Sequence, residues 1–118
     1  MKNQSFAKKV RNALSGISFA WANERNFRTQ VIFGLVTFIV FFIIQPAAFW
    51  WALIVLSATL VFAAELANSA IEALADHLHP ELHPVVGKVK DMLAGMVLVM
   101  SVGAGIVGMI ALYDTLGA

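Results

Sequence analysis

A long apolar run at residues 31–64 constrains this fold more than any other feature. Apart from Gln45, Pro46 and a few small residues, the run is apolar, and it is too long for one membrane crossing, which needs about 20 residues. Proline lacks an amide donor and disfavours helix in the residue before it, so Gln45-Pro46 must form a turn. The run therefore predicts two spans, at about 30–44 and 47–77.

A third apolar segment, 92–113, is also long enough to cross a bilayer. Its expected helix, about 88–113, carries glycines that allow close helix packing in lipid. The chain is 60% hydrophobic and 13% charged, which excludes a soluble domain of this size. We therefore expect a single all-α integral membrane domain over 1–118 with three transmembrane helices.

Residues 5–23 have a different pattern. Apolar residues recur there at intervals of three and four, and the opposite helical face carries Lys8, Lys9 and Arg11. This predicts an amphipathic interfacial helix with its lysines near anionic head groups.

All eight basic residues precede the first span or lie between the second and third, so the amino terminus and the 76–91 loop are expected to be cytoplasmic. The net charge of +1 gives no indication of a nucleic-acid partner.

The polar residues of the second span share one helical face. Glu65, Asn68, Glu72 and Asp76 follow one another at steps of three, four and four. A carboxylate at the bilayer centre costs roughly 2.5 to 3.5 kcal/mol, so Glu65 should face protein, a polar cleft or the interface. We interpret the stripe as a functional site. The alternative, that it is only the solvated end of the helix, stays open, above all for Asp76.

Two further polar pairs lie at the same membrane depth: Glu24 with Arg28 before the first span, and Lys90 with Asp91 before the third. Carboxylates gathered with a lysine suit Mg²⁺, which takes oxygen ligands and bridges protein to phosphate. Taken singly, Glu24 with Arg28 could be a helix ion pair, and Lys90 could reach to the interface. The segment with histidines 77, 79 and 83 contains two prolines, Pro80 and Pro84, which break the helical spacing of a tight ligand set, so we interpret it as a loop rather than a zinc site. No soluble-kinase phosphate loop is recognisable.

The run from Glu65 through Asn68, Glu72 and Asp76, followed by Glu81-Leu-His83-Pro84 and Lys90-Asp91, resembles the signature of the prokaryotic diacylglycerol kinase family, which includes undecaprenol kinases. Glu24-Arg-Asn-Phe-Arg28 also matches. The resemblance implies a homotrimer in the bacterial inner membrane with active sites between subunits. Its implied reaction transfers the γ-phosphoryl group of MgATP to a lipid hydroxyl, in phospholipid or cell-envelope lipid-carrier metabolism.

The resemblance also implies residue roles. Glu65 matches the general base and Asn68 the polar residue beside it, while Glu24 and Glu72 match the Mg²⁺ ligands. Lys90 and Asp91 match catalytic and nucleotide-contacting residues, and the turn that carries Glu81 and His83 also matches a nucleotide contact. The residues expected to border the lipid are Glu65, Ala94 and Arg28.

Both the lipid substrate and the functional class of the protein have alternatives. Diacylglycerol kinases of Gram-negative type have a serine where this chain has Ala94, and the Ala94-Gly95 pattern is more similar to the undecaprenol kinase branch. A small proton-coupled transporter that uses Glu65 is the alternative function, and a structural subunit without chemistry is a third. The transporter leaves Glu24, Glu72 and the Lys90-Asp91 pair unexplained.

Overall fold

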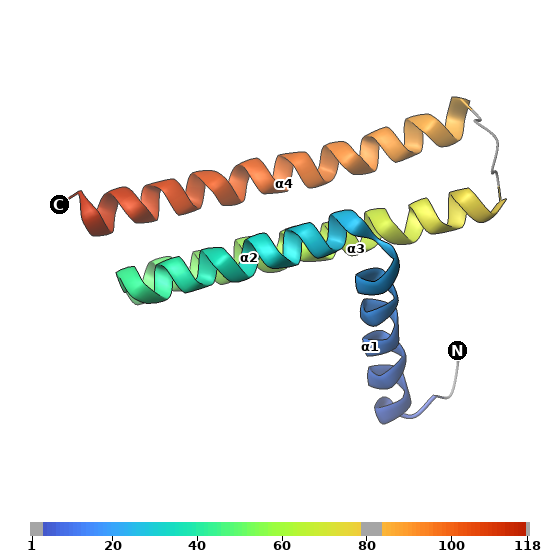
Figure 1. Cartoon of the computed structure of the whole chain (residues 1–118), viewed down its shortest axis with the longest axis horizontal. Coiled ribbons are helices and arrows are strands. Elements are labelled where there is room, and N and C mark those ends of the chain that lie inside the picture. Colours follow the sequence, from blue (N-terminus) through green and yellow to red (C-terminus); the bar gives the residue numbers. More distant parts are fainter. Residues whose placement is uncertain (1–3, 79–83, 118) are drawn as a thin grey trace.

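Four helices make up the part of the chain that the computed structural model describes, residues 4–78 and 84–117 (Figure 1). They are α1 (Phe6–Asn23), α2 (Arg25–Ile44), α3 (Ala48–Leu78) and α4 (Pro84–Leu116). By length and composition, α2, α3 and α4 are able to cross a membrane. The all-α prediction, with three membrane helices after an amphipathic one, is confirmed.

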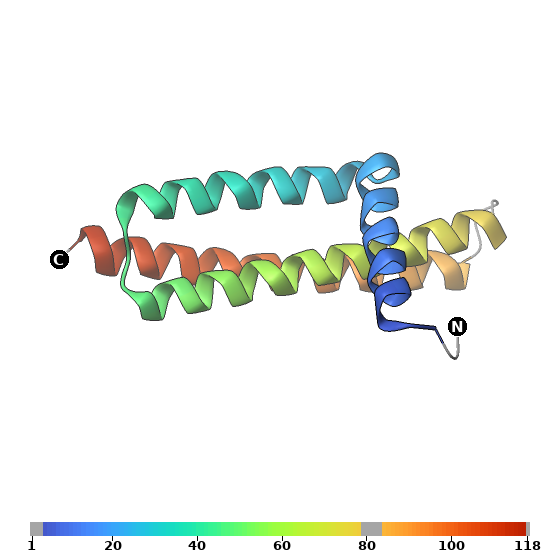
Figure 2. The ribbon, with the colours of Figure 1, turned by 90° about the horizontal axis from the view of Figure 1, so that it is seen from below.

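The helix α1 lies crosswise to the other three (Figures 1 and 2). Ser5 caps its first turn, because its side-chain oxygen accepts a hydrogen bond from the Lys8 amide at 3.2 Å. The helix stops at Asn23 because Glu24 is extended, with φ −116° and ψ 106°, and α2 begins at the next residue. Glu24 therefore forms a one-residue corner between two helices.

The turn between α2 and α3 confirms the sequence prediction at Gln45-Pro46. Gln45 adopts a left-handed conformation, with φ 61°, and its amide donates to the Phe41 carbonyl at 2.8 Å. We call this side of the bundle the turn end. Trp50 Nε1 there donates to Asp114 Oδ2 at 2.8 Å and ties α3 to the last turn of α4.

The opposite side, where α3 ends and α4 begins, is called the acid end. The helix α3 contacts all three others, most extensively α4, and the part of its polar face that carries Glu65, Asn68 and Ser69 is buried. Many large apolar side chains on α2 and α4 are exposed, for example Phe33 and Val99 at 71% each. This suits helices that are solvated by lipid rather than water.

Two helices extend beyond the spans expected from hydrophobicity. α2 begins at Arg25 rather than at about 30, and α4 covers Pro84–Leu116 rather than about 88–113. Helix ends are set by capping and by backbone dihedral angles, not by polarity: Glu24 is the extended residue before α2, and proline suits the first turn of α4. α3, Ala48–Leu78, lies close to the expected 47–77.

Candidate functional site

The polar stripe of α3 changes from buried to exposed along the helix. Glu65, Asn68 and Ser69 are only 3%, 6% and 5% exposed, Glu72 is half-buried and Asp76 is exposed. At 1.5 Å of rise per residue, Glu65 lies about 16 Å from Asp76 along the helix axis. The stripe therefore connects the helix packing to the surface at the acid end.

The most deeply buried acid, Glu65, is incompletely satisfied. Asn68, one turn later, provides a side-chain hydrogen bond to its carboxylate, but Oε2 is buried and has no hydrogen-bond partner in the described part of the chain. An unsatisfied buried acceptor costs about 1 to 3 kcal/mol. The polar stripe therefore contains one acceptor that the described part of the chain does not satisfy.

The corner between α1 and α2 brings Glu24 to this stripe. Burial raises the pKa of the half-buried Glu24 carboxyl, and repulsion from Glu72 and Asp76 raises it further. Glu24 also interacts electrostatically with Glu65. The structure therefore brings Glu24 close enough to the stripe for these carboxylates to repel one another, although they are far apart in the sequence.

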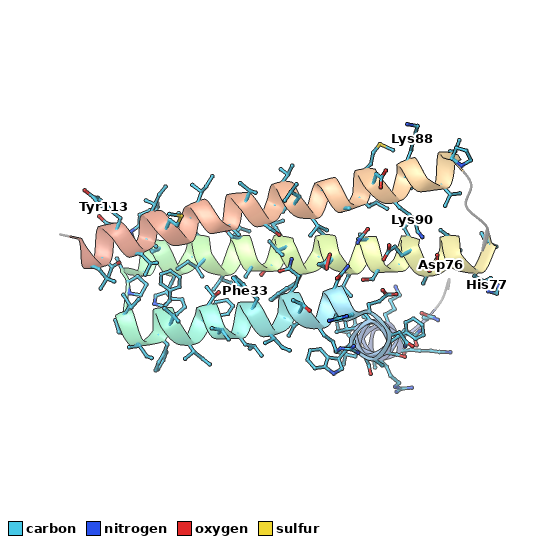
Figure 3. All side chains as sticks on the ribbon, turned by 45° about the horizontal axis from the view of Figure 1, so that its top comes forward. Phe33, Asp76, His77, Lys88, Lys90 and Tyr113 are labelled. Carbon is cyan, nitrogen blue, oxygen red and sulfur yellow. The ribbon has the colours of Figure 1, made fainter. Side chains whose placement is uncertain are left out.

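On α4, Lys90 points toward α3 (Figure 3). Its Nζ lies 3.0 Å from Asp76 Oδ1, and it also interacts electrostatically with Glu72. Sequence reasoning had left Asp76 between a functional residue and a solvated helix end, and did not pair it with Lys90. The i, i+4 spacing from Glu72 to Asp76 was a signal in the sequence that Asp76 belongs to the stripe. Its pairing with Lys90 depends on how α4 packs against α3.

The remaining residues of the predicted site are not seen to join the cluster around the stripe. Asp91 and Ala94 are exposed on α4, and within the described ranges no ion pair joins Asp91 to the stripe. The Arg28 guanidinium donates to the carbonyls of Trp21 and Ala22, at 2.9 and 3.2 Å. The helix ion pair considered for Arg28 and Glu24 is thus replaced by a cap on α1. Glu81 and His83 lie outside the described residues.

The acids also fit a divalent cation. The Glu24 carboxyl is repelled by Glu72 and Asp76, a repulsion that a bound cation would relieve, and carboxylate oxygens are the ligands that Mg²⁺ prefers. In residues 4–78 and 84–117, no three His, Cys, Asp or Glu side chains form a ready-made metal site. A cation here would take one or two carboxylates and complete its shell with phosphate and water, which is the usual pattern for Mg²⁺.

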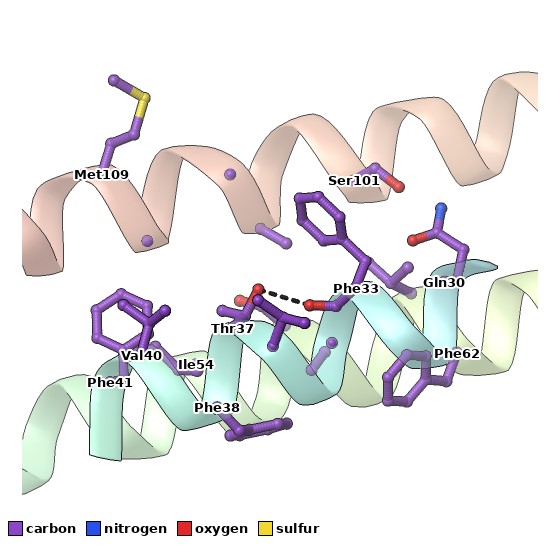
Figure 4. A pocket seen from close by; sticks show the side chains of 18 of the residues that line it. Gln30, Phe33, Thr37, Phe38, Val40, Phe41, Ile54, Phe62, Ser101 and Met109 are labelled. Carbon is purple, nitrogen blue, oxygen red and sulfur yellow. Dashed lines mark hydrogen bonds between the residues drawn. The ribbon is translucent and has the colours of Figure 1, made fainter. Parts of the chain in front are cut away.

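Two hollows adjoin the acids. One, of about 350 Å³, lies between α2, α3 and α4, and its lining reaches Val61 and Phe62, within a turn of Glu65 (Figure 4). The other, of about 480 Å³, lies between α1 and α3 and is bordered by Glu24 and Ser69. Both are lined mainly by apolar side chains and can accept hydrocarbon.

Three membrane-spanning helices with a buried carboxylate and an acid–lysine cluster at one end define a small multi-pass membrane protein with a polar site beside apolar hollows. The family model for prokaryotic diacylglycerol kinase matches residues 11–112. The chain belongs to the prokaryotic diacylglycerol kinase family, and is a lipid kinase.

Individual relatives agree with this membership. The chain is 33% identical to a diacylglycerol kinase of Escherichia coli (strain K12) over 102 residues, which cover 86% of this chain and 84% of that one. It is 31% identical to the undecaprenol kinase of Bacillus subtilis over 105 residues, which cover 89% and 85%. A diacylglycerol kinase of Helicobacter pylori (strain J99) is 34% identical over 84 residues, which cover 71% and 66%. These comparisons do not favour the transporter alternative.

Proposed function

We propose that this protein transfers the γ-phosphoryl group of MgATP to the hydroxyl of a membrane lipid, with Glu65 as the general base. The observation that carries the proposal is the buried Glu65 Oε2, which lacks a partner in the described chain and lies next to further acids. A lipid hydroxyl that hydrogen-bonds to this oxygen can pass its proton to Glu65 as its own oxygen bonds to phosphorus. The leaving group is ADP.

The other polar residues of the site would bind the metal ion and orient the general base. Glu24 and Glu72 would bind Mg²⁺, which supplies positive charge to the phosphates. Asn68 orients the Glu65 carboxylate through its hydrogen bond, so that Oε2 stays directed at the acceptor. Phosphoryl transfer depends mainly on positioning and charge stabilisation, which these side chains can supply without a soluble-kinase fold.

The nucleotide contacts are assigned to Lys90, Asp91, Glu81 and His83. Lys90 is already beside the stripe, whereas Asp91 is exposed on the single chain. An exposed Asp91 can serve a site that is completed by another copy, and this supports the proposed homotrimer. We place the protein in the bacterial inner membrane with a cytoplasmic amino terminus, because the basic residues all lie on one side.

The lipid is undecaprenol or diacylglycerol, because the relatives include diacylglycerol kinases of Escherichia coli and Helicobacter pylori and the undecaprenol kinase of Bacillus subtilis. Ala94 and Gly95 favour undecaprenol. We assign Ala94 and Arg28, with Glu65, to the border of the lipid site. The hollow between α2, α3 and α4 supports a lipid acceptor, because its apolar lining extends to Val61 and Phe62, about one turn from Glu65.

The test is phosphoryl transfer from labelled ATP, with magnesium, to undecaprenol and to diacylglycerol in parallel mixed micelles. We expect product on one lipid and its loss in Glu65→Gln. Asp114→Asn is the matched control, because it removes an acid from the last turn of α4, at the turn end, whereas the stripe extends to the acid end. No transfer to either lipid, or equal transfer by Glu65→Gln, contradicts the proposal.

A further inference from the structure

The contact between Lys90 and Asp76 joins α4 to α3 at the acid end. Lys90 Nζ donates to Asp76 Oδ1 at 3.0 Å, and the two side chains are 32% and 71% exposed. An ion pair this exposed adds little to stability, because water screens it and the long lysine side chain must be ordered. Its main effect is to fix where the lysine ammonium lies.

That position matters because a second carboxylate is close. Glu72 precedes Asp76 by one helical turn, about 6 Å along the axis, and it already interacts electrostatically with Lys90. The lysine stem is flexible. If Asp76 did not hold the ammonium, the next acid of the stripe available to it would be Glu72. An ammonium bound there would occupy oxygens that a divalent cation needs.

We propose that Asp76 is a positioning residue that holds Lys90 at the exposed end of the stripe and so leaves the Glu72 carboxylate free for a divalent cation. The inference rests on the cation-binding role proposed for Glu24 and Glu72. It adds a residue that touches neither the reacting atoms nor the metal. The lysine still has two N–H groups available for phosphate while the third is donated to Asp76.

The effect of Asp76 through Lys90 must be separated from its own charge, since Asp76 also repels the Glu24 carboxyl. A double-mutant cycle does this. Mn²⁺ is titrated into the purified, nucleotide-free protein in detergent, and the free ion is followed by electron paramagnetic resonance. The proteins are the wild type, Asp76→Asn, Lys90→Gln and the double variant, with Glu72→Gln to identify binding at the proposed site.

We expect Asp76→Asn to raise the Kd for Mn²⁺ by roughly fivefold, the factor for one unit charge acting at about 4 Å in a water-like medium. In the Lys90→Gln background the same substitution should have little effect, because no ammonium remains to move. Asp76→Glu, which keeps the carboxylate, should bind Mn²⁺ as the wild type does. Circular dichroism and size-exclusion chromatography check that every variant keeps its fold and assembly.

An unchanged Kd in Asp76→Asn overturns the inference. So does an equal rise in both backgrounds, because the effect is then the through-space charge of Asp76 alone. These outcomes leave the proposed metal role of Glu72 intact. If the wild type shows no Mn²⁺ binding that depends on Glu72, the metal role itself fails and the inference fails with it.

Discussion

Glu65→Gln should stabilise the protein while abolishing its activity. The wild-type side chain is 3% exposed and has one oxygen without a partner among the described residues, a deficit worth about 1 to 3 kcal/mol. A glutamine keeps the size and can retain the hydrogen bond to Asn68. It removes the negative charge that interacts with Glu72 and Glu24, which should add a further ~1 kcal/mol.

The net gain is smaller, because the glutamine amide nitrogen is itself incompletely paired, and we expect about 1 to 2 kcal/mol. The assay is thermal unfolding in detergent at neutral pH, beside lipid phosphorylation by the same preparations. Asn68→Asp, which adds a carboxylate next to Glu65, should have the opposite effect on stability. A variant that is less stable than the wild type, or one that still phosphorylates lipid, would refute the reasoning.

Three further outcomes are expected. Because burial and the neighbouring acids raise the folded-state pKa of Glu24, the folded protein binds more protons than the unfolded chain between the unfolded and folded pKa values. Stability without divalent cation should fall as pH rises through that window, and this dependence should be weaker in the unfolding of Glu24→Gln. Gln45→Val should lower the unfolding free energy by about 1 kcal/mol, because a β-branched residue is more strained at φ 61° than glutamine and loses the Nε2 hydrogen bond to the Phe42 carbonyl, whereas Gln45→Gly, which relieves the strain, should be tolerated in the same thermal scan. Trp50→Phe should cost about 1 to 2 kcal/mol by removing the 2.8 Å bond to Asp114, with little change in phosphorylation per folded molecule.

Much of the fold follows from local sequence. The apolar run has room for two crossings, and Gln45-Pro46 is the place where its helix must end. The i, i+4 spacing of Glu65, Asn68 and Glu72 places them on one face whatever surrounds the helix. These features depend only on backbone geometry and hydrophobicity, which act within a short stretch of chain.

The remaining features depend on how the helices meet. The role of Arg28 as a cap follows from the angle between α1 and α2, which one extended residue sets. The pairing of Lys90 with Asp76, and the exposure of Asp91 beside it, follow from the rotation of α4 against α3. Successive residues of a helix are rotated by about 100° around its axis. The adjacency of Lys90 and Asp91 in the sequence therefore did not mean that both side chains point toward α3.

Glu24 is the only residue between α1 and α2, so no flexible linker separates α1 from the site. A flexible linker would absorb movement of a surface helix, but here the corner residue is itself one of the gathered acids. Any change in the angle between α1 and α2 therefore moves the Glu24 carboxyl directly. The orientation of the first helix and the position of one acid of the site are set by the same pair of backbone dihedral angles.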